Sequence, residues 1–207
     1  MYIPDLYKNE NAEEIQNFLR ANGFAILISQ SDRKLLASHI PLVLDVDTTG
    51  AQVLIGHLSK LNPQASSFTN EAEVLAVFSG AHAYISSSWY DHENVPTWNY
   101  IAVHVYGTVR LYNEEETITS LKKLVDRYEI NSENPVRVEE LSERTMREAK
   151  GIVAFEIAIT SLEAVKKLSQ NRDAKNYQNI VTELEKTNDS QAIAVAEAMK
   201  KNRPSTS

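Results

Sequence analysis

"FAILISQSDRKLLASHIPLVLDVDTTGAQVLIGHL", residues 24–58, holds the pattern that decides the fold class of this chain. Three apolar, β-rich runs at 24–30, 34–45 and 51–58 are separated by short polar segments that contain Ser-Asp and Thr-Thr-Gly. Such segments are typical of turns between neighbouring strands. The stretch therefore predicts three short strands with tight connections.

The same pattern continues in the next part of the chain. Strand-like runs follow at 73–80, 81–89 and 100–112, with Ser-Gly between the first two. Six short strands with tight connections predict an antiparallel barrel or sandwich. The chain also returns to a strand at 151–163, after a segment of helical character.

Helices are predicted around these strands rather than between them. Residues 11–23 read as an amphipathic helix that ends at a glycine, and Asn113 with Glu116 forms a capping-box start for another. Two further helices are predicted at 173–186 and 190–201. The expected class is mainly β with peripheral helices, an α+β arrangement.

Composition narrows the range of possible functions. The 207 residues suit one domain, and the absence of cysteine excludes disulfides and thiolate chemistry. The net charge of -7 disfavours a nucleic-acid surface. The chain starts without a basic and apolar leader and contains no apolar run of about 18 residues. We therefore expect a cytoplasmic protein that does not enter a membrane.

Polar residues recur where the predicted strands end. The stretch "VPTWNYIAVH" at 95–104 combines Thr97, Trp98 and Asn99 in three consecutive positions. Other members of this pattern are Ser38, His39, His57, Ser59, Lys60, Asn62, Ser86, Ser87, Gln170 and Arg172. Hydroxyls, amides and a few cations, without a paired nucleophile and base, favour recognition of an anion and a heterocycle. Taken singly, each has a structural alternative: His39 as a satisfied strand histidine, Trp98 as a core or interface ring.

Several other site types fit the sequence poorly. The five histidines show no close metal-binding pair, so no metal is expected. The chain has no G-x-S-x-G elbow, and its six glycines do not form a Rossmann or P-loop phosphate motif.

Taken together, the polar clusters resemble a known family. "MYIP", "ASHIPL", "GHLSKLNPQ", "FSGAHAYISSSWY", "VPTWNYIAVHVYG" and "GIVAFEIAI" leading to "KKLSQNR" occur in family order over residues 1–172. They resemble the PaiB-type proteins, the FMN-binding negative transcriptional regulator family. The resemblance implies a six-stranded antiparallel split β-barrel at 1–172, with a C-terminal helical extension at 173–207 packed on the barrel and ending in a frayed tail.

The resemblance also implies a homodimer that holds FMN in interface clefts, with groups from both chains. Lys60 and Arg172, with Ser59, Ser86 and Ser87, would meet the phosphate, while His39 and His57 would donate to flavin or phosphate oxygens. Trp98 would cover the isoalloxazine ring. The whole implied cofactor-binding set is Ser38, His39, His57, Ser59, Lys60, Asn62, Ser86, Ser87, Thr97, Trp98, Asn99, Gln170 and Arg172, and no catalytic residue is assigned.

Three classes of function remain open at this point. They are a flavin-binding regulatory protein without turnover, an FMN-dependent oxidoreductase of the flavin reductase or pyridoxamine phosphate oxidase-like class, and a direct DNA-binding repressor. The helix at 190–201 presents few side chains suited to DNA before Lys200 and Lys201. We expect it instead to dock Ile193, Ala196 and Met199 on the barrel, which makes direct DNA binding doubtful.

Overall fold

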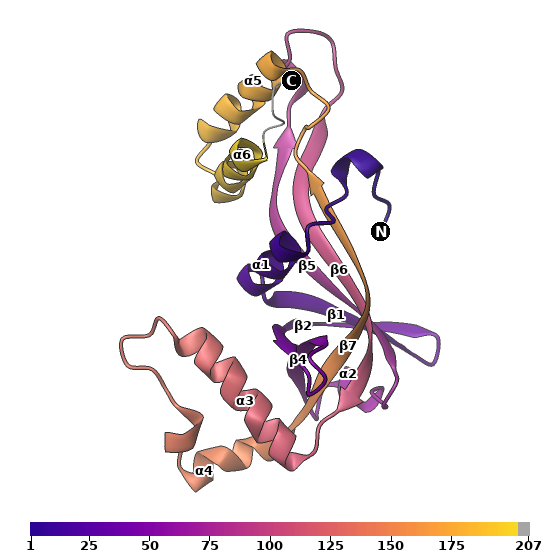
Figure 1. The fold of residues 1–207 in the computed structure, drawn as a ribbon, viewed down its shortest axis with the longest axis vertical. Helices are drawn as coiled ribbons and strands as arrows, with labels where there is room; N and C mark the ends of the chain where they lie inside the picture. Colours follow the sequence, from indigo (N-terminus) through magenta and orange to yellow (C-terminus); the bar gives the residue numbers. More distant parts are fainter. Residues whose placement is uncertain (203–207) are drawn as a thin grey trace. The chain divides into compact units, whose positions relative to one another are not determined.

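The computed structural model describes residues 1–202, which form a mixed α+β fold (Figure 1). The strands are β1 (Phe24–Ser31), β2 (Lys34–Pro41), β3 (Val43–Val46), β4 (Gln52–Ser59), β5 (Glu73–Ile85), β6 (Thr97–Leu111) and β7 (Ile152–Lys167). The helices are α1 (Ala12–Ala21), α2 (Pro63–Ser66), α3 (Glu114–Glu129), α4 (Glu143–Met146), α5 (Ala174–Glu185) and α6 (Ser190–Lys201). The short 3-10 turns are η1 (Asp5–Tyr7), η2 (Ser87–Trp89), η3 (Val138–Glu140) and η4 (Arg147–Gly151).

The predicted count of six strands is wrong, because residues 1–202 contain one seven-stranded sheet. The run 34–45 breaks at Leu42 into β2 and β3, and the run 151–163 lies in β7. Conversely, the run 73–80 and the first part of the run 81–89 belong to the single strand β5, which ends at Ile85, and Ser87–Trp89 form the turn η2. The glycine between them makes no turn. A Cβ on Gly80 would lie 2.6 Å from the ring of Phe18, so this glycine makes room for α1.

The sheet is not closed into the predicted barrel. Its strand order is β2-β1-β5-β6-β7-β4-β3, which leaves β2 and β3 as edges. Strand β1 pairs antiparallel with β2 and β5, and β4 pairs antiparallel with β3 and β7. The two edge strands are nevertheless consecutive in the chain, with only Leu42 between them. A sheet whose two edges are joined by one residue must curl.

Leu42 is fixed in place at this junction. Its backbone N–H donates to the carbonyl of Gly23 at 2.8 Å, and its side chain is 1% exposed. A Cβ on Gly56 of β4 would lie 2.6 Å from Leu42 Cδ2 and 3.2 Å from the Pro41 carbonyl oxygen. The absence of a side chain at Gly56 therefore lets the junction pack directly on the backbone of β4.

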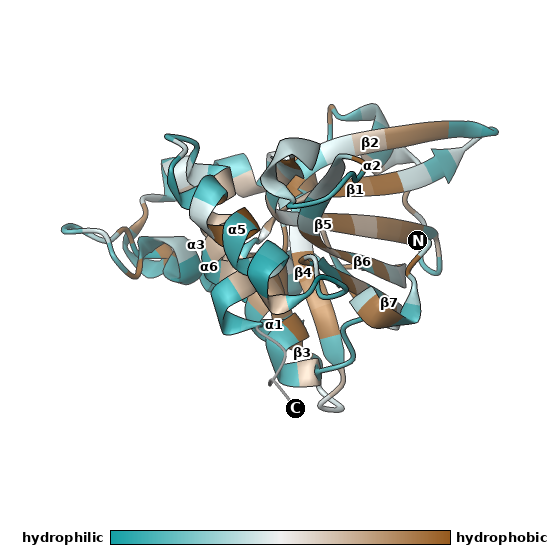
Figure 2. Ribbon diagram, turned by 90° about the horizontal axis from the view of Figure 1, so that it is seen from above, coloured by the Kyte–Doolittle hydropathy of each residue, from teal (hydrophilic) through white to brown (hydrophobic). Residues whose placement is uncertain are grey.

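The chain divides into two compact units, each with its own core. Unit 1 comprises residues 1–18, 79–103 and those from 163 onward, and unit 2 comprises 19–78 and 104–162. Hydrophobic residues are concentrated along β1, β2, β5 and β7 (Figure 2). Fully buried side chains of unit 2 include Leu27, Leu54, Phe78, Phe155 and Ile157, and those of unit 1 include Ile85, Leu168, Ile180, Leu184, Val195 and Met199.

The helices agree closely with the sequence patterns. Asn113 and Glu116 form the expected capping box at the start of α3, and Asp173 caps α5. In α6, Ala196 and Met199 are buried as expected, whereas Ile193 is 40% exposed and Val195 is buried instead. The division into a domain at 1–172 and an extension at 173–207 stays a prediction, and the expected frayed tail, 203–207, lies outside the described residues.

Leu42→Ala should lower the free energy of unfolding by about 2–5 kcal/mol, because it removes a fully buried side chain at the junction of the two sheet edges. The matched control is Leu61→Ala, the same change at a side chain that is 93% exposed. Urea denaturation of both variants measures the difference. Equal stability of the two variants would contradict the role given to Leu42.

Candidate functional site

The thirteen residues predicted to bind the cofactor fall into two sets. Unit 2 holds Ser38, His39, His57, Ser59, Lys60 and Asn62, and unit 1 holds Ser86, Ser87, Thr97, Trp98, Asn99, Gln170 and Arg172. Each set gathers residues that are distant in sequence. Their roles toward a cofactor stay predictions, and the geometry of each set follows.

The first set forms a corner between β2 and the loop that leads from β4 into α2, called here the β4–α2 corner. Asn62 Nδ2 donates to Ser38 Oγ at 2.8 Å, which ties the loop to β2. Ser59 Oγ accepts from the N–H of Leu61 at 3.2 Å and shapes the turn. The turn presents Lys60, whose exposed ammonium group forms no ion pair with any of residues 1–202.

The short helix after this turn does not itself offer an anion site. Asn62 caps α2, its Oδ1 accepting from the N–H of Gln64 at 2.9 Å, while its carbonyl accepts from the N–H of Ala65. Pro63 has no N–H to donate. The first N–H groups of α2 are therefore occupied by Asn62.

Two histidines lie in this part of unit 2. His57 is half-buried in β4 opposite Ala154 of β7, and burial lowers its pKa below the ordinary 6.5. A neutral imidazole at pH 7 has one donor and one acceptor nitrogen. His39 is exposed on β2 and its ring stacks near Phe24, with centroids 6.2 Å apart.

Gln64 is a buried member of the corner that lies outside the predicted cofactor-binding set. Its Nε2 donates to the Leu27 carbonyl at 3.0 Å and to Ser29 Oγ at 3.1 Å, and its Oε1 is buried without a partner. Its place in "LNPQ", one residue after the helix-starting proline, was the available signal.

A pocket of about 400 Å³ opens beside Lys60. It is lined mostly by apolar side chains, among them Leu111, Ile118 and Ile152. Its other charged residues are Lys150, a second cation, and Glu114, so cations outnumber carboxylates. Pockets of this size and character are typical of small-molecule sites. The β4–α2 corner thus holds two hydroxyls and places an unpaired cation at a mostly apolar pocket, with His57 two residues before Ser59 in β4. Such groups fit a phosphate attached to a heterocycle.

In unit 1, strand alternation separates Trp98 from Asn99. Trp98 is 52% exposed, and its ring lies 5.9 Å from that of Tyr84 and 6.2 Å from that of His82. These three side chains form an exposed aromatic patch, so Trp98 is not a core ring. Asn99 points to the other face and is fully buried, where its Nδ2 donates to Ser169 Oγ at 2.9 Å.

The remaining members of the second set have partners within unit 1. Ser86 caps η2, accepting from the N–H of Ser88, and Ser87 is half-buried in the same turn. The side-chain amide of Gln170 bonds two backbone groups: its Oε1 accepts from the N–H of Leu168, and its Nε2 donates to the carbonyl of Lys166. Thr97 Oγ1 accepts from Lys167 Nζ at 2.5 Å, and the Arg172 guanidinium lies 5.0 Å over the ring of Tyr90.

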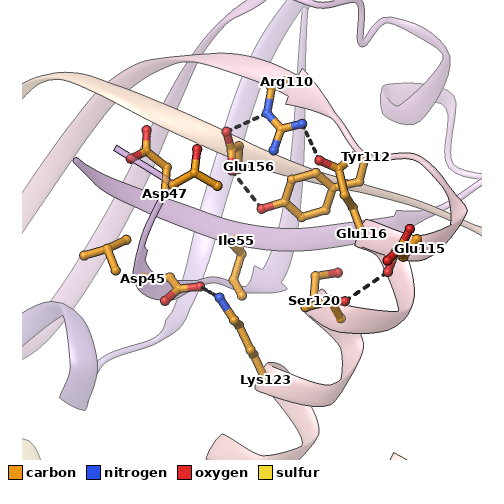
Figure 3. Close-up of a pocket in the computed structure, with 13 residues that line it drawn as sticks. Asp45, Asp47, Ile55, Arg110, Tyr112, Glu115, Glu116, Ser120, Lys123 and Glu156 are labelled. Carbon is orange, nitrogen blue, oxygen red and sulfur yellow. Dashed lines mark hydrogen bonds and ion pairs between the residues drawn. The ribbon is translucent and has the colours of Figure 1, made fainter. Parts of the chain in front are cut away.

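A larger pocket of unit 2 has a different charge pattern (Figure 3). It measures about 570 Å³, and its buried Glu156 accepts from Arg110 at 2.7 Å and from the Tyr112 hydroxyl at 2.9 Å. Burial and Glu156 raise the pKa of Tyr112. The charged residues that line this pocket are Asp45, Asp47, Glu115, Glu116, Glu156, Arg110 and Lys123. Because carboxylates outnumber cations, this pocket disfavours a phosphate.

Within residues 1–202, no three histidine, aspartate or glutamate side chains are grouped so that they would hold a metal ion. None of the helices in that range has the length and apolar character needed to cross a bilayer.

Comparison with known proteins identifies the family. Residues 1–161 match the family described as "Putative FMN-binding domain". The chain belongs to this family. Over 200 residues it is 40% identical to the "Protease synthase and sporulation protein PAI 2" of Bacillus subtilis (strain 168), and the match covers 96% of each protein. The expected PaiB-type relationship is confirmed, and FMN is the cofactor of this family.

Solved structures support the fold at low sequence identity. The FAD and heme binding protein from Mycobacterium smegmatis has a TM-score of 0.63 and 18% identity, covering 83% of this chain and 78% of its own. The flavocytochrome Anf3 from Azotobacter vinelandii also has a TM-score of 0.63, with 13% identity, covering 86% of this chain and 78% of its own. These likenesses concern the fold alone.

The buried position of His57 predicts a pH dependence of stability. Its pKa is lowered in the folded state, so as the pH falls below 6.5 the unfolded chain takes up a proton first and stability decreases. The loss ends once the pH is below the folded pKa. His57→Gln should remove this contribution to the pH dependence of the free energy of unfolding. Urea denaturation between about pH 5 and 7 measures it. His82→Gln, at an exposed ring, should keep it, and a wild-type slope in His57→Gln would refute this prediction.

Proposed function

We propose that this protein binds FMN as a homodimer and acts as a flavin-binding regulatory protein, without reading DNA directly. The observation that carries the proposal is the β4–α2 corner, where an unpaired Lys60 lines a mostly apolar pocket and the hydroxyls of Ser38 and Ser59 belong to the same corner. Membership in the FMN-binding family supports the choice of ligand. The name of the Bacillus subtilis relative refers to sporulation, which supports a regulatory role.

The corner suits the phosphate end of FMN. Lys60 supplies a positive charge that no carboxylate of residues 1–202 neutralises, and neutral His57 supplies one N–H donor. Charge-assisted hydrogen bonds of this kind are stronger than neutral ones. When bound, FMN supplies the redox chemistry itself, while these side chains hold and orient it.

The homodimer is supported by the aromatic patch of Trp98, Tyr84 and His82. Aromatic rings are enriched in protein interfaces, where they contribute large contact areas. The patch lies on β5 and β6, next to the exposed Val95 at the entry to β6. A second copy of the chain is the occupant we propose for it.

Direct DNA reading is disfavoured by the charges of α6. Lys200, near its end, forms ion pairs with Glu185 and Glu197, so its charge is already balanced within the chain. The net charge of -7 adds to this argument. Regulation would then act through a partner or through flavin chemistry. Reduction of bound FMN by NAD(P)H would instead favour the alternative, an FMN-dependent oxidoreductase.

Lys60→Ala should weaken FMN binding about ten- to a hundredfold, because it removes a charge-assisted contact to the phosphate. Riboflavin, which lacks the phosphate, should bind the variant nearly as well as it binds the wild type. Flavin fluorescence titration measures both affinities. The matched control is Lys34→Ala, the same change at another exposed lysine of unit 2. Equal weakening of FMN and riboflavin would show that Lys60 is not a phosphate ligand.

Trp98→Ala should weaken both dimerisation and FMN binding while the chain stays folded, because Trp98 is an exposed ring of the proposed interface. Sedimentation velocity and a flavin titration on the same sample measure the two effects. Tyr2→Ala, at a ring that is 87% exposed, is the control. A folded, fully dimeric Trp98→Ala protein with undiminished FMN affinity would falsify the proposed interface cleft.

A further inference from the structure

Unit 1 contains a pair of cations that no carboxylate balances. Lys167 ends β7, and Arg172 follows it in the turn that leads to α5. Both are half-buried, and neither forms an ion pair with any of residues 1–202. Burial, and then the charge of Arg172, lowers the pKa of Lys167. Two half-buried positive charges repel each other, so the arrangement of Lys167 and Arg172 is unfavourable unless an anion binds between or beside them.

The carboxylates near the pair in sequence and at the start of α5 have other partners, and Glu163 pairs with the N-terminal ammonium group. Asp173 caps α5, its Oδ1 accepting from the N–H groups of Lys175 and Asn176 at 3.0 Å. Asp91, which lies near the start of α5, pairs with Lys175 at 2.8 Å and accepts from Asn176. The like charges of Lys167 and Arg172 are therefore not neutralised through these residues.

The turn between Lys167 and Arg172 is held in place by several hydrogen bonds. Ser169 has a φ of 61°, a left-handed conformation that is unfavourable for serine and persists only when neighbouring contacts impose it. Its side chain is buried against Asn99. Gln170 accepts from the N–H of Leu168 at 2.7 Å and donates to the Lys166 carbonyl at 2.5 Å, and the N–H of Arg172 donates to the Ser169 carbonyl at 3.0 Å. These bonds hold the backbone on both sides of the pair.

The groups around the pair add donors and no negative charge. Thr97 Oγ1 accepts from Lys167 Nζ at 2.5 Å, so the hydroxyl proton of Thr97 remains available to another acceptor. Arg172 lies over the ring of Tyr90, which supports the guanidinium from one side and leaves its N–H edge free. The planar edge of a guanidinium matches two oxygens of a phosphate.

We propose that Lys167, Arg172 and Thr97 form an anion-binding site that receives a phosphate group. A phosphate monoester carries up to two negative charges near neutral pH, which two cations balance, and its several oxygens match the ammonium, guanidinium and hydroxyl donors. Arg172 and Thr97 belong to the predicted cofactor-binding set, so the proposal rests on the proposed FMN function where the phosphate is that of FMN, and Lys167 is the residue it adds. The phosphate can come from FMN or from another phosphorylated ligand, and the experiment separates the two.

The test uses Lys167→Met in the full chain, with inorganic phosphate, FMN and riboflavin as probes in thermal denaturation and titration. Without ligand, the variant should be as stable as the wild type or more stable, because a half-buried, unbalanced charge is gone. Its affinity for phosphate should fall by about tenfold or more. A purely structural lysine would show the opposite pattern, a loss of stability with unchanged phosphate binding, and that result would overturn the proposal.

The matched control is Lys166→Met, the neighbouring lysine, which pairs with Glu14 at 2.6 Å and should leave phosphate binding unchanged. Arg172→Gln provides a second variant that should lose phosphate binding with Lys167 in place. If Lys167→Met weakens FMN but not riboflavin, the flavin phosphate occupies the site. If it weakens only inorganic phosphate, another phosphorylated ligand is the occupant, and the proposed FMN site at Lys60 is unaffected. If Lys167→Met and Arg172→Gln bind inorganic phosphate and FMN as tightly as the wild type does, the proposed site is overturned.

Discussion

The sheet of this protein depends on one constraint, the single residue Leu42 that connects its two edge strands. Because β2 and β3 lie at opposite ends of the strand order and yet follow one another in the chain, the sheet has to curl. Gly56 permits the close approach that this requires, since any side chain there would collide with Leu42. The curl also brings β2 beside the end of β4, where Asn62 binds Ser38. The β4–α2 corner is thus a consequence of the curled sheet.

Charge balance distinguishes the possible ligand sites in unit 2. In the larger pocket, the negative charge of Glu156 is balanced by Arg110, and Glu156 also accepts a hydrogen bond from Tyr112. These three polar side chains therefore already have partners within the pocket. At the β4–α2 corner the cation of Lys60 has no such partner. An unpaired cation is the more informative feature in a chain with a net charge of -7, because acidic partners are abundant. The smaller pocket is for this reason the better candidate for an anionic ligand.

The "VPTWNY" segment shows how one short stretch serves two purposes. Successive side chains of a strand point to opposite faces. Trp98 is therefore exposed beside Tyr84, while Asn99 is buried and connects β6 to the turn at Ser169. The neighbouring Thr97 contacts Lys167 in the same region. Its unusual composition reflects an exposed surface and a buried polar connection that lie one residue apart.

The sequence by itself determined the local structure and the family. Periodicity and capping residues identified α1, α3, α5 and α6 because helices are stabilised by contacts a few residues apart, and the ordered motifs were specific enough to indicate an FMN-binding family. Only the tertiary structure decided that Gly80 accommodates Phe18 instead of making a turn, that the sheet has seven strands, and that Gln64 is buried behind the corner. The same holds for the balance of charges at Lys60 and Lys167. Each of these depends on residues far apart in the chain, and their proximity is set by how the sheet curls and packs rather than by any local pattern.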